Sequence, residues 1–188
     1  MNSVIKLLAI AELTVKDEIS VRVHPVMLPV THPLASVRDA FDAVYVESEA
    51  AGQLMFYGRG AGGAPTASAI LGDLVAVTRH RAYSTVGYGE SDYADLDIAP
   101  LGDVKSQFLI RLWVADKSGV LAGIATVFAK QGVSIQGVRQ SGMGLDAELI
   151  VVTHAATEDD LDATVEALKA MDIVKNVESV IRVEGVGA

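Results

Sequence analysis

The sequence predicts an α+β protein with two units, a mixed or antiparallel sheet that carries one helix and a following ferredoxin-like βαββαβ unit. Three observations lead to this prediction. The N-terminal part alternates short apolar runs with polar turns, which is typical of hairpins. A glycine-rich turn then opens a single helix. From Gln107 onward the pattern changes to strand, helix, strand, strand, helix, strand, which is a split βαβ order.

The composition limits the size of the core and the kinds of partner. A chain of 188 residues with 51% hydrophobic content can bury one moderate core or two small ones, and we expect two small units. The net charge of −9 disfavours nucleic acid and anionic membranes, because both would repel the chain. No cysteine is present, which excludes disulfides and thiolate ligands and fits a reducing cytoplasm. The apolar start is interrupted by Glu12, so neither a membrane span nor a signal peptide is expected.

Two hairpins are predicted in the first unit. The first joins strand-like runs at residues 3–15 and 19–27 through the polar turn 16–18. The second joins Ala43–Glu49 and Gln53–Tyr57 through residues 50–52. Between them, regular structure is expected to stop at three prolines: Pro25, Pro29 and Pro33.

A helix from about Pro65 to Arg79 follows the glycine-rich turn, with its proline in the first helical turn. The stretch 80–106 lacks a sustained apolar period, so it is predicted to be an irregular linker.

The turn itself satisfies the pattern G-x-G-x-x-G through Gly58, Gly60 and Gly63. Between a strand and a helix this pattern indicates a dinucleotide site, because glycines let the backbone approach a phosphate and the helix N-terminus attracts an anion. A Rossmann unit also needs a buried parallel strand after the helix, ending in an acid, whereas a polar stretch follows here. A self-contained dinucleotide-binding protein is therefore disfavoured, and a tight turn that only packs a helix on a sheet remains the alternative.

The two helices of the second unit have amphipathic patterns that would cover one face of a four-stranded sheet. A capping box of Thr157 and Asp160 is predicted to open the second of them. The residues expected on the buried faces are Val120, Leu121, Ile124, Val127 and Phe128 in the first helix, and Leu161, Val165 and Leu168 in the second.

The first unit resembles the C-terminal half of the homoserine dehydrogenase catalytic region. The resemblance rests on IKLLAIAE, VRVHPVMLP, HPLA and YGRGAGGAPTASAILGDLV, in that order and spacing. It implies that Gly60, Ala61 and Gly62 close over the nicotinamide end of NAD or NADP. These residues would complete a cofactor site, but they would not form such a site by themselves. The family places its main nucleotide fingerprint, acid/base lysine, homoserine-binding carboxylates and cation site upstream of the position of Met1. We therefore assign no catalytic residue and expect this chain alone to be inactive.

The second unit resembles an ACT domain, on the segment FLIRLWVADKSGVLAGIATVFAKQGVSIQGVRQ. The resemblance implies an amino-acid effector, with threonine favoured, bound where two ACT domains meet. The effector-binding residues that it implies are Asp116, Ser118, Gly119, Val120, Leu121, Ser134, Ile135 and Gln140. Ser134 stands where the family often has asparagine. The alternative is an ACT fold that only dimerises, in which Asp116 and Ser118 cap a helix.

The leading hypothesis is thus a fragment of homoserine dehydrogenase, with the catalytic and dimerisation part at residues 1–100 and the regulatory ACT domain at 106–188. The parent enzyme would interconvert L-homoserine and L-aspartate 4-semialdehyde with NAD or NADP. A stand-alone amino-acid sensor or dimerisation protein is the alternative. A homo-oligomer is expected through the ACT domain and the sheet unit. No metal site is predicted, because the four histidines are scattered along the chain.

Overall fold

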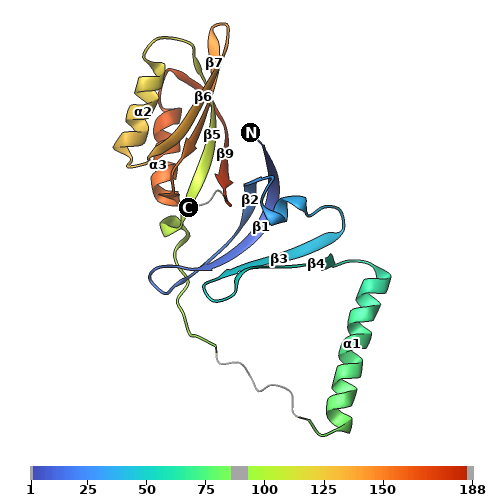
Figure 1. The fold of residues 1–188 in the computed structure, drawn as a ribbon. Helices are drawn as coiled ribbons and strands as arrows, with labels where there is room; N and C mark the ends of the chain where they lie inside the picture. The colour runs from blue at the N-terminus through green and yellow to red at the C-terminus, as the bar shows by residue number, and fades with distance from the viewer. Residues whose placement is uncertain (1, 86–92, 186–188) are drawn as a thin grey trace. The chain divides into compact units, whose positions relative to one another are not determined.

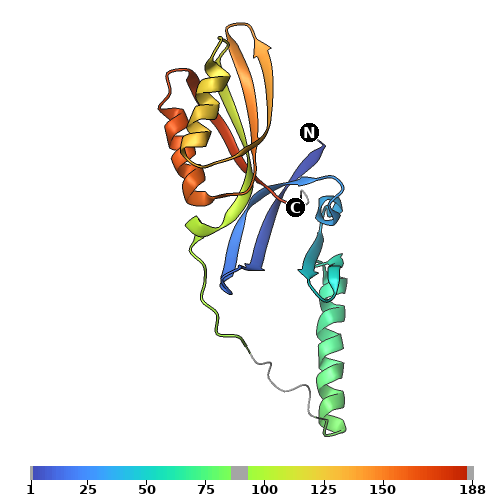
Figure 2. The same cartoon turned by 60° about the vertical axis from the view of Figure 1, so that its left-hand side comes forward.

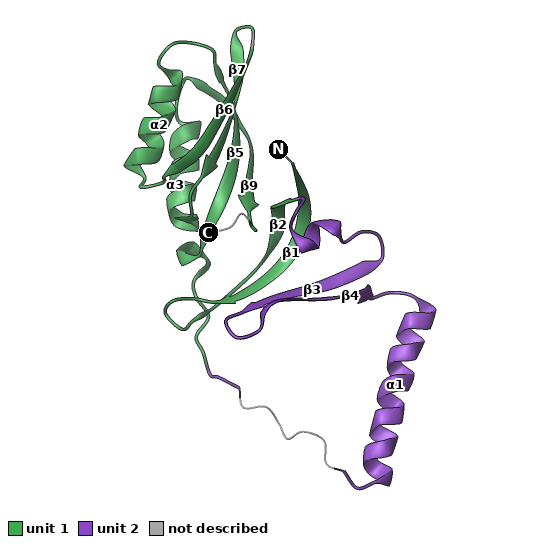
Figure 3. Cartoon of the chain, viewed as in Figure 1, with its two compact units in different colours: residues 1–29, 96–188 green, residues 30–95 purple. Residues whose placement is uncertain are grey.

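The computed structural model describes residues 2–85 and 93–185. They form two compact units, one made of residues 1–29 with 96–188 and the other of residues 30–95 (Figure 3). Both combine strands with helices, as the sequence predicts for an α+β protein.

The C-terminal part of the first unit is the predicted βαββαβ fold. Its strands are β5 (Lys105–Ala115), β6 (Ile135–Met143), β7 (Asp146–Thr153) and β9 (Val174–Val183), and its helices are α2 (Val120–Lys130) and α3 (Glu158–Lys169). The strands lie in the order β9-β5-β7-β6, all antiparallel, and a short strand, β8 (Ala156–Thr157), pairs with the start of β5. Both helices cover the same face of this sheet (Figures 1 and 2).

The core of this fold lies between the helices and that face. Alternate residues of β5 are buried because successive side chains of a strand point to opposite faces: Phe108, Ile110, Leu112 and Val114. On α2, Val120, Ile124 and Phe128 recur at the helical spacing of four and are buried against them. The prediction for Leu121 was wrong, since its side chain is 43% exposed. Leu121 follows Val120 by one residue, or about 100° around the helix, which turns it away from the sheet.

The predicted first hairpin is also confirmed. It consists of β1 (Ser3–Leu13) and β2 (Ile19–Pro29), paired antiparallel along their whole length. β2 also pairs in parallel with β9, through Val26 with Arg182 and Met27 with Val183, so the hairpin extends the C-terminal sheet. The domain boundary predicted between residues 100 and 106 stays a prediction, and this compact unit crosses it.

Pro25 does not stop regular structure, contrary to the prediction, but lies inside β2 opposite Leu7. The Met27 carbonyl accepts a hydrogen bond from the Glu184 backbone N–H, so Met27 faces β9. Pro25, two residues earlier, faces the same side, where the pairing with β9 covers only Val26 and Met27. The N–H that proline lacks is therefore not needed for a ladder hydrogen bond.

The second unit contains a 3-10 turn (Pro33–Ser36), the hairpin β3 (Phe41–Ser48) and β4 (Gly52–Arg59), and helix α1 (Gly63–Ala82). The hairpin and the helix match the predictions, with longer bounds. α1 buries none of its residues.

The predicted linker at 80–106 is only partly irregular. α1 runs to Ala82, a short 3-10 helix, η2, spans Leu101–Asp103, and Ile98 bridges to Ile19. Residues 86–92 lie outside the described part. None of the helices described is long and apolar enough to cross a membrane.

Candidate functional sites

The glycine-rich turn connects β4 to α1 and is exposed. Gly62 has a φ of +130°, a conformation open to glycine but rarely to other residues, and it is the N-cap of α1. The first turn of α1 contains no acidic side chain, so its free N–H groups and positive dipole end have no charged partner from the helix itself. Gly60, Ala61 and Gly62 therefore present backbone at a helix N-terminus, which is suited to a close anionic or polar ligand.

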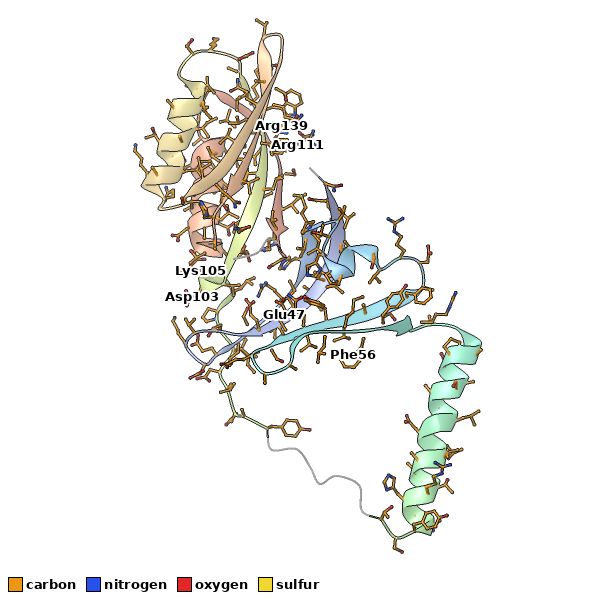
Figure 4. All side chains as sticks on the ribbon, viewed as in Figure 1. Glu47, Phe56, Asp103, Lys105, Arg111 and Arg139 are labelled. Carbon is orange, nitrogen blue, oxygen red and sulfur yellow. The ribbon has the colours of Figure 1, made fainter. Side chains whose placement is uncertain are left out.

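Asp42 lies against this turn, a contact that the sequence analysis missed. A Cβ added at Gly60 would overlap the Asp42 carboxylate, so position 60 has no room for a side chain while Asp42 keeps this place. Asp42 pairs with Gly58 across the hairpin, and this register could have been inferred from the predicted turn. Asp42, Gly58 and Gly60 line a shallow depression of about 350 Å³, together with Phe56, which is labelled in Figure 4.

The surroundings of the turn do not make a Rossmann unit. β3 and β4 are antiparallel, and β5 is the next strand after α1 in the described part of the chain. The alternative of a turn that packs its helix on a sheet is not observed either, because α1 buries no residue.

In the βαββαβ fold, the turn between β5 and α2 is held against β6. The Asp116 carboxylate accepts a hydrogen bond from Gln140 Nε2 at 3.4 Å, and its backbone N–H donates to the Leu145 carbonyl at 3.0 Å. Gly142 leaves room for it, because an added Cβ would approach Asp116 Oδ2 to 2.9 Å. The N-cap of α2 is Gly119 with φ +88°, and it makes no side-chain capping bond. The capping role considered for Asp116 and Ser118 is thus not observed.

The eight predicted effector residues fall into two groups at opposite ends of α2. Asp116, Ser118, Gly119, Val120, Leu121 and Gln140 lie around its N-terminal end. Ser134 and Ile135 instead line a depression of about 360 Å³ beside its C-terminal end. An 11-residue helix is about 16 Å long, so a single chain does not bring the two groups together.

The histidines serve different local roles. His32 Nδ1 accepts a hydrogen bond from the Leu34 N–H at 3.2 Å, and His80 Nδ1 lies 2.9 Å from Thr85 Oγ1. His24 is buried. Across the described residues, no group of three metal-ligating side chains occurs.

A buried polar cluster on β2 was missed by the sequence analysis. Ser20, Arg22 and His24 alternate with exposed residues, and in an amphipathic strand the polar set would be expected to face solvent. Here the polar set is the buried one, with relative exposures of 8% or less. Burial lowers the pKa of Arg22, but hydrogen bonds and charge from Glu12 and then Glu184 outweigh it and leave this pKa above its ordinary value.

Comparisons with known proteins agree with both sequence resemblances. The homoserine dehydrogenase family model matches residues 1–75, and the ACT domain model matches residues 108–172. Homoserine dehydrogenase from Corynebacterium glutamicum is 53% identical over 184 residues, covering 96% of this chain and 41% of the relative. The Mycobacterium tuberculosis homoserine dehydrogenase is 50% identical over 197 aligned residues, covering all of this chain and 45% of the relative.

Among solved structures, a homoserine dehydrogenase from Thiobacillus denitrificans superimposes with a TM-score of 0.87 at 34% identity, covering 99% of this chain and 43% of that one. The chain thus spans less than half the length of the relatives that it matches. It combines a segment of the homoserine dehydrogenase family at residues 1–75 with an ACT domain at residues 108–172.

Proposed function

We propose that residues 1–188 are the cofactor-closing and regulatory part of a homoserine dehydrogenase, which interconverts L-homoserine and L-aspartate 4-semialdehyde with NAD or NADP. The observation that carries the proposal is the match of the whole chain to homoserine dehydrogenases at up to 53% identity. The exposed apolar side chains of α1 support it. Five large apolar side chains of α1 are at least 48% exposed: Ile70, Leu71, Leu74, Val75 and Val77. Apolar surface on this scale is typical of an interface, here with the remainder of the enzyme.

In this proposal Gly60, Ala61 and Gly62 close over the nicotinamide end of the cofactor. NAD or NADP supplies and accepts the hydride. The chain contributes a turn without bulky side chains, which lies against Asp42, and the N-terminus of α1, whose first turn has no acidic side chain. The proton-transferring group belongs to another part of the enzyme, so residues 1–188 alone are expected to be inactive.

A chimera tests this proposal. In the Corynebacterium glutamicum relative, the segment that aligns with this chain is replaced by residues 1–188. The chimera is expected to oxidise NADPH or NADH in the presence of aspartate semialdehyde, whereas residues 1–188 alone give no turnover above background. A folded but inert chimera, or turnover by residues 1–188 alone, would contradict the proposal.

A glycine variant of the chimera tests the cofactor turn. Gly62→Ala forces a φ near +130° on alanine, a strain of about 1–3 kcal/mol. We expect the KM for the cofactor to rise about tenfold, which corresponds to about 1.4 kcal/mol. Gly72→Ala is the matched control, because Gly72 lies within α1 with open space around it and should leave this KM unchanged. Equal KM values for the two variants would exclude the turn from the cofactor site.

We infer that the ACT domain binds an amino-acid effector, and we favour threonine, between two copies. β6 is the outermost strand of its sheet. If two copies of β6 paired antiparallel about a two-fold axis, the start of one would lie beside the end of the other. Ser134 and Ile135 of one copy would then approach the turn at Asp116 of the second copy, which joins the two groups that α2 separates. The helix N-terminus would receive the effector carboxylate, and the Asp116 carboxylate its ammonium group.

A thermal-shift experiment tests the effector site. Threonine at about 100 times its dissociation constant should stabilise the protein by about 2.7 kcal/mol, a rise in Tm of several degrees. Asp116→Ala should abolish the shift, whereas Asp172→Ala, at another exposed aspartate of the same domain, should keep it. Light scattering is expected to show a dimer or larger oligomer. A shift that survives in Asp116→Ala would place the effector elsewhere.

The second candidate, a stand-alone dimerisation protein, is favoured by one observation. The predicted effector residues do not converge within one chain. It would be supported by an oligomer that shows no thermal shift with any of the common amino acids and by a chimera without activity.

A further inference from the structure

The buried face of β2 is polar at one end and apolar at the other. Val26 and Leu28 have no exposed surface, as expected for a strand that covers a core. On the same face, Ser20 is fully buried, Arg22 is 7% exposed and His24 is 8% exposed. The polar half of this face therefore needs partners within the compact unit, because water does not reach it.

The partners of Arg22 come from the hairpin itself, through Ser20 and Glu12, and from one residue beyond the end of β9, Glu184. Arg22 Nη1 donates to Glu12 Oε1 on β1 at 2.6 Å, and Arg22 Nη2 donates to Glu184 Oε1 beyond the end of β9 at 3.2 Å. A second pair lies close by, in which Arg182 of β9 makes two hydrogen bonds of 2.6 Å with the Glu158 carboxylate of α3. The hairpin β1–β2 is thus joined to the segment after β9 by one charged hydrogen bond, from Arg22 to Glu184, while the pair of Arg182 and Glu158 lies within the βαββαβ fold next to it.

Backbone contacts hold β2 at both ends. Near its C-terminal end, two residue pairs of β2 and β9 are in register, together with the hydrogen bond of 3.1 Å from Glu184 N to the Met27 carbonyl. At its start, Ile19 exchanges two backbone hydrogen bonds with Asp97 and Ala99, in the segment that leads to β5. At its turn end the hairpin adds an exposed ion pair of 3.6 Å between Lys16 and Asp103, which contributes little in water. Between these two ends, the hairpin docks through the buried side chains of β2.

His24 is the member of this group without a partner. Its Nε2 has no hydrogen bond to any described residue, although the side chain is more than nine-tenths buried. Burial lowers the pKa of His24, the charges of Arg182 and Arg22 lower it further, and Glu158 opposes this shift. Glu12 and Glu184 are both bound by Arg22, and Lys6 of β1, which pairs with Val26, is a further charged residue on the same face of the hairpin as His24. A proton on His24 would thus add a positive charge beside two arginines whose carboxylates are already engaged.

We propose that His24 is a pH-sensitive latch that keeps the hairpin β1–β2 docked on the ACT domain while its imidazole is neutral, and releases the hairpin when it is protonated. Because the hairpin belongs to the segment that matches homoserine dehydrogenase, the latch couples the two matched parts of the chain. It does not depend on the dehydrogenase activity proposed above.

The sign of the pH effect follows from linkage. The pKa of His24 is below its ordinary value of 6.5 in the docked state and returns toward that value when the hairpin leaves. Docking is therefore at full strength above pH 6.5 and weakens as the pH falls from there toward the lowered pKa. A single proton changes the docking equilibrium by at most about tenfold per pH unit, so about tenfold is the upper limit between pH 7.5 and 5.5.

Hydrogen exchange on residues 1–188 measures this effect. Protection factors, which correct for the intrinsic pH dependence of exchange, are compared at pH 7.5 and 5.5 for peptides from β1, β2 and β5. Protection in β2 is expected to fall several-fold at pH 5.5, while β5 in the core of the ACT domain keeps its protection. Unchanged protection of β2 would overturn the proposal.

Two variants and a titration make the test specific. His24→Gln keeps a neutral polar side chain and should remove the pH dependence in β2. His154→Gln changes an exposed histidine of the same compact unit, and the pH dependence of protection in β2 should then be the same as in the unaltered chain. If His24→Gln fails to fold, the NMR titration of the His24 ring in the unaltered chain decides, because a midpoint at or above 6.5 would overturn the latch.

Discussion

Replacing Ile124 by alanine is expected to destabilise the ACT domain by about 2–5 kcal/mol, the usual cost of such a truncation in a packed core. Ile124 has no exposed surface and lies in the core between α2 and the sheet. Urea unfolding followed by Trp113 fluorescence on β5 measures the loss. The midpoint should fall while the slope of the transition stays the same.

Leu121→Ala is the matched control on the same helix. The Leu121 side chain is 43% exposed, so its truncation should cost less than about 1 kcal/mol in the absence of effector. The sequence pattern alone places both residues on the buried face and predicts similar losses. Equal losses would show that Leu121 is covered in solution, as it would be at an interface between copies.

The order of secondary structure could be predicted because local patterns determine it here. Thr157 accepts a hydrogen bond from the Asp160 N–H at 3.2 Å, as the capping box predicts, and the helix begins at Glu158. Both hairpins follow from polar or glycine-containing turns between apolar runs. Such signals need only neighbours in the sequence.

The corrections concern features that depend on distant parts of the chain. Pro25 is tolerated in β2 because the pairing with β9 covers only Val26 and Met27, so the N–H that proline lacks is not needed there. No local sequence pattern indicates where this pairing ends. The polar face of β2 is buried because Glu184 and the start of α3 lie against it, more than 130 residues away in sequence. Burial of this kind depends on the tertiary arrangement. The alternation in β2 alone therefore predicts, wrongly, that the face with the polar residues is exposed.

The candidate sites were located only in part for the same reason. The residues at Gly60–Gly62 and at Asp116 come from contiguous motifs, and their turns are found where the motifs place them. The separation of Ser134 from Asp116 by the length of α2 could be read only from the fold.

On the face of the ACT sheet opposite the helices, charged side chains of neighbouring strands form pairs that water can reach. Arg111 on β5 donates to Glu148 on β7 at 2.5 Å, and Trp113 Nε1 donates to Glu178 at 3.0 Å. Arg111 and Arg139 are labelled on this sheet in Figure 4. Register pairs Arg111 and Arg139 with the same residue, Ile150, so both extend from the face opposite the helices. Such exposed pairs contribute about 0–1 kcal/mol each and do not hold the fold together.

The pair between Arg182 and Glu158 differs because it is largely buried. The Glu158 side chain is 9% exposed and that of Arg182 25%, and the guanidinium lies 5.8 Å from the centre of the Phe108 ring. Removing one partner leaves the other charge without its counterion in a region of low dielectric constant, which is where the cost arises. Removing both avoids that cost.

A double-mutant cycle is therefore expected to show strong coupling at this pair. Glu158→Gln should destabilise residues 1–188 by about 3 kcal/mol, the lower end of the range for breaking a buried pair, because Arg182 keeps some contact with water. The double variant Glu158→Gln/Arg182→Met should lose clearly less than the sum of the two single variants in urea unfolding at pH 7.5. Glu166→Gln, which breaks an exposed pair with Lys169 on the same helix, is the control and should stay within about 0.5 kcal/mol of the unaltered chain. Additive losses in the cycle would mean that the two side chains act independently and that the pair does not stabilise the ACT domain as a unit.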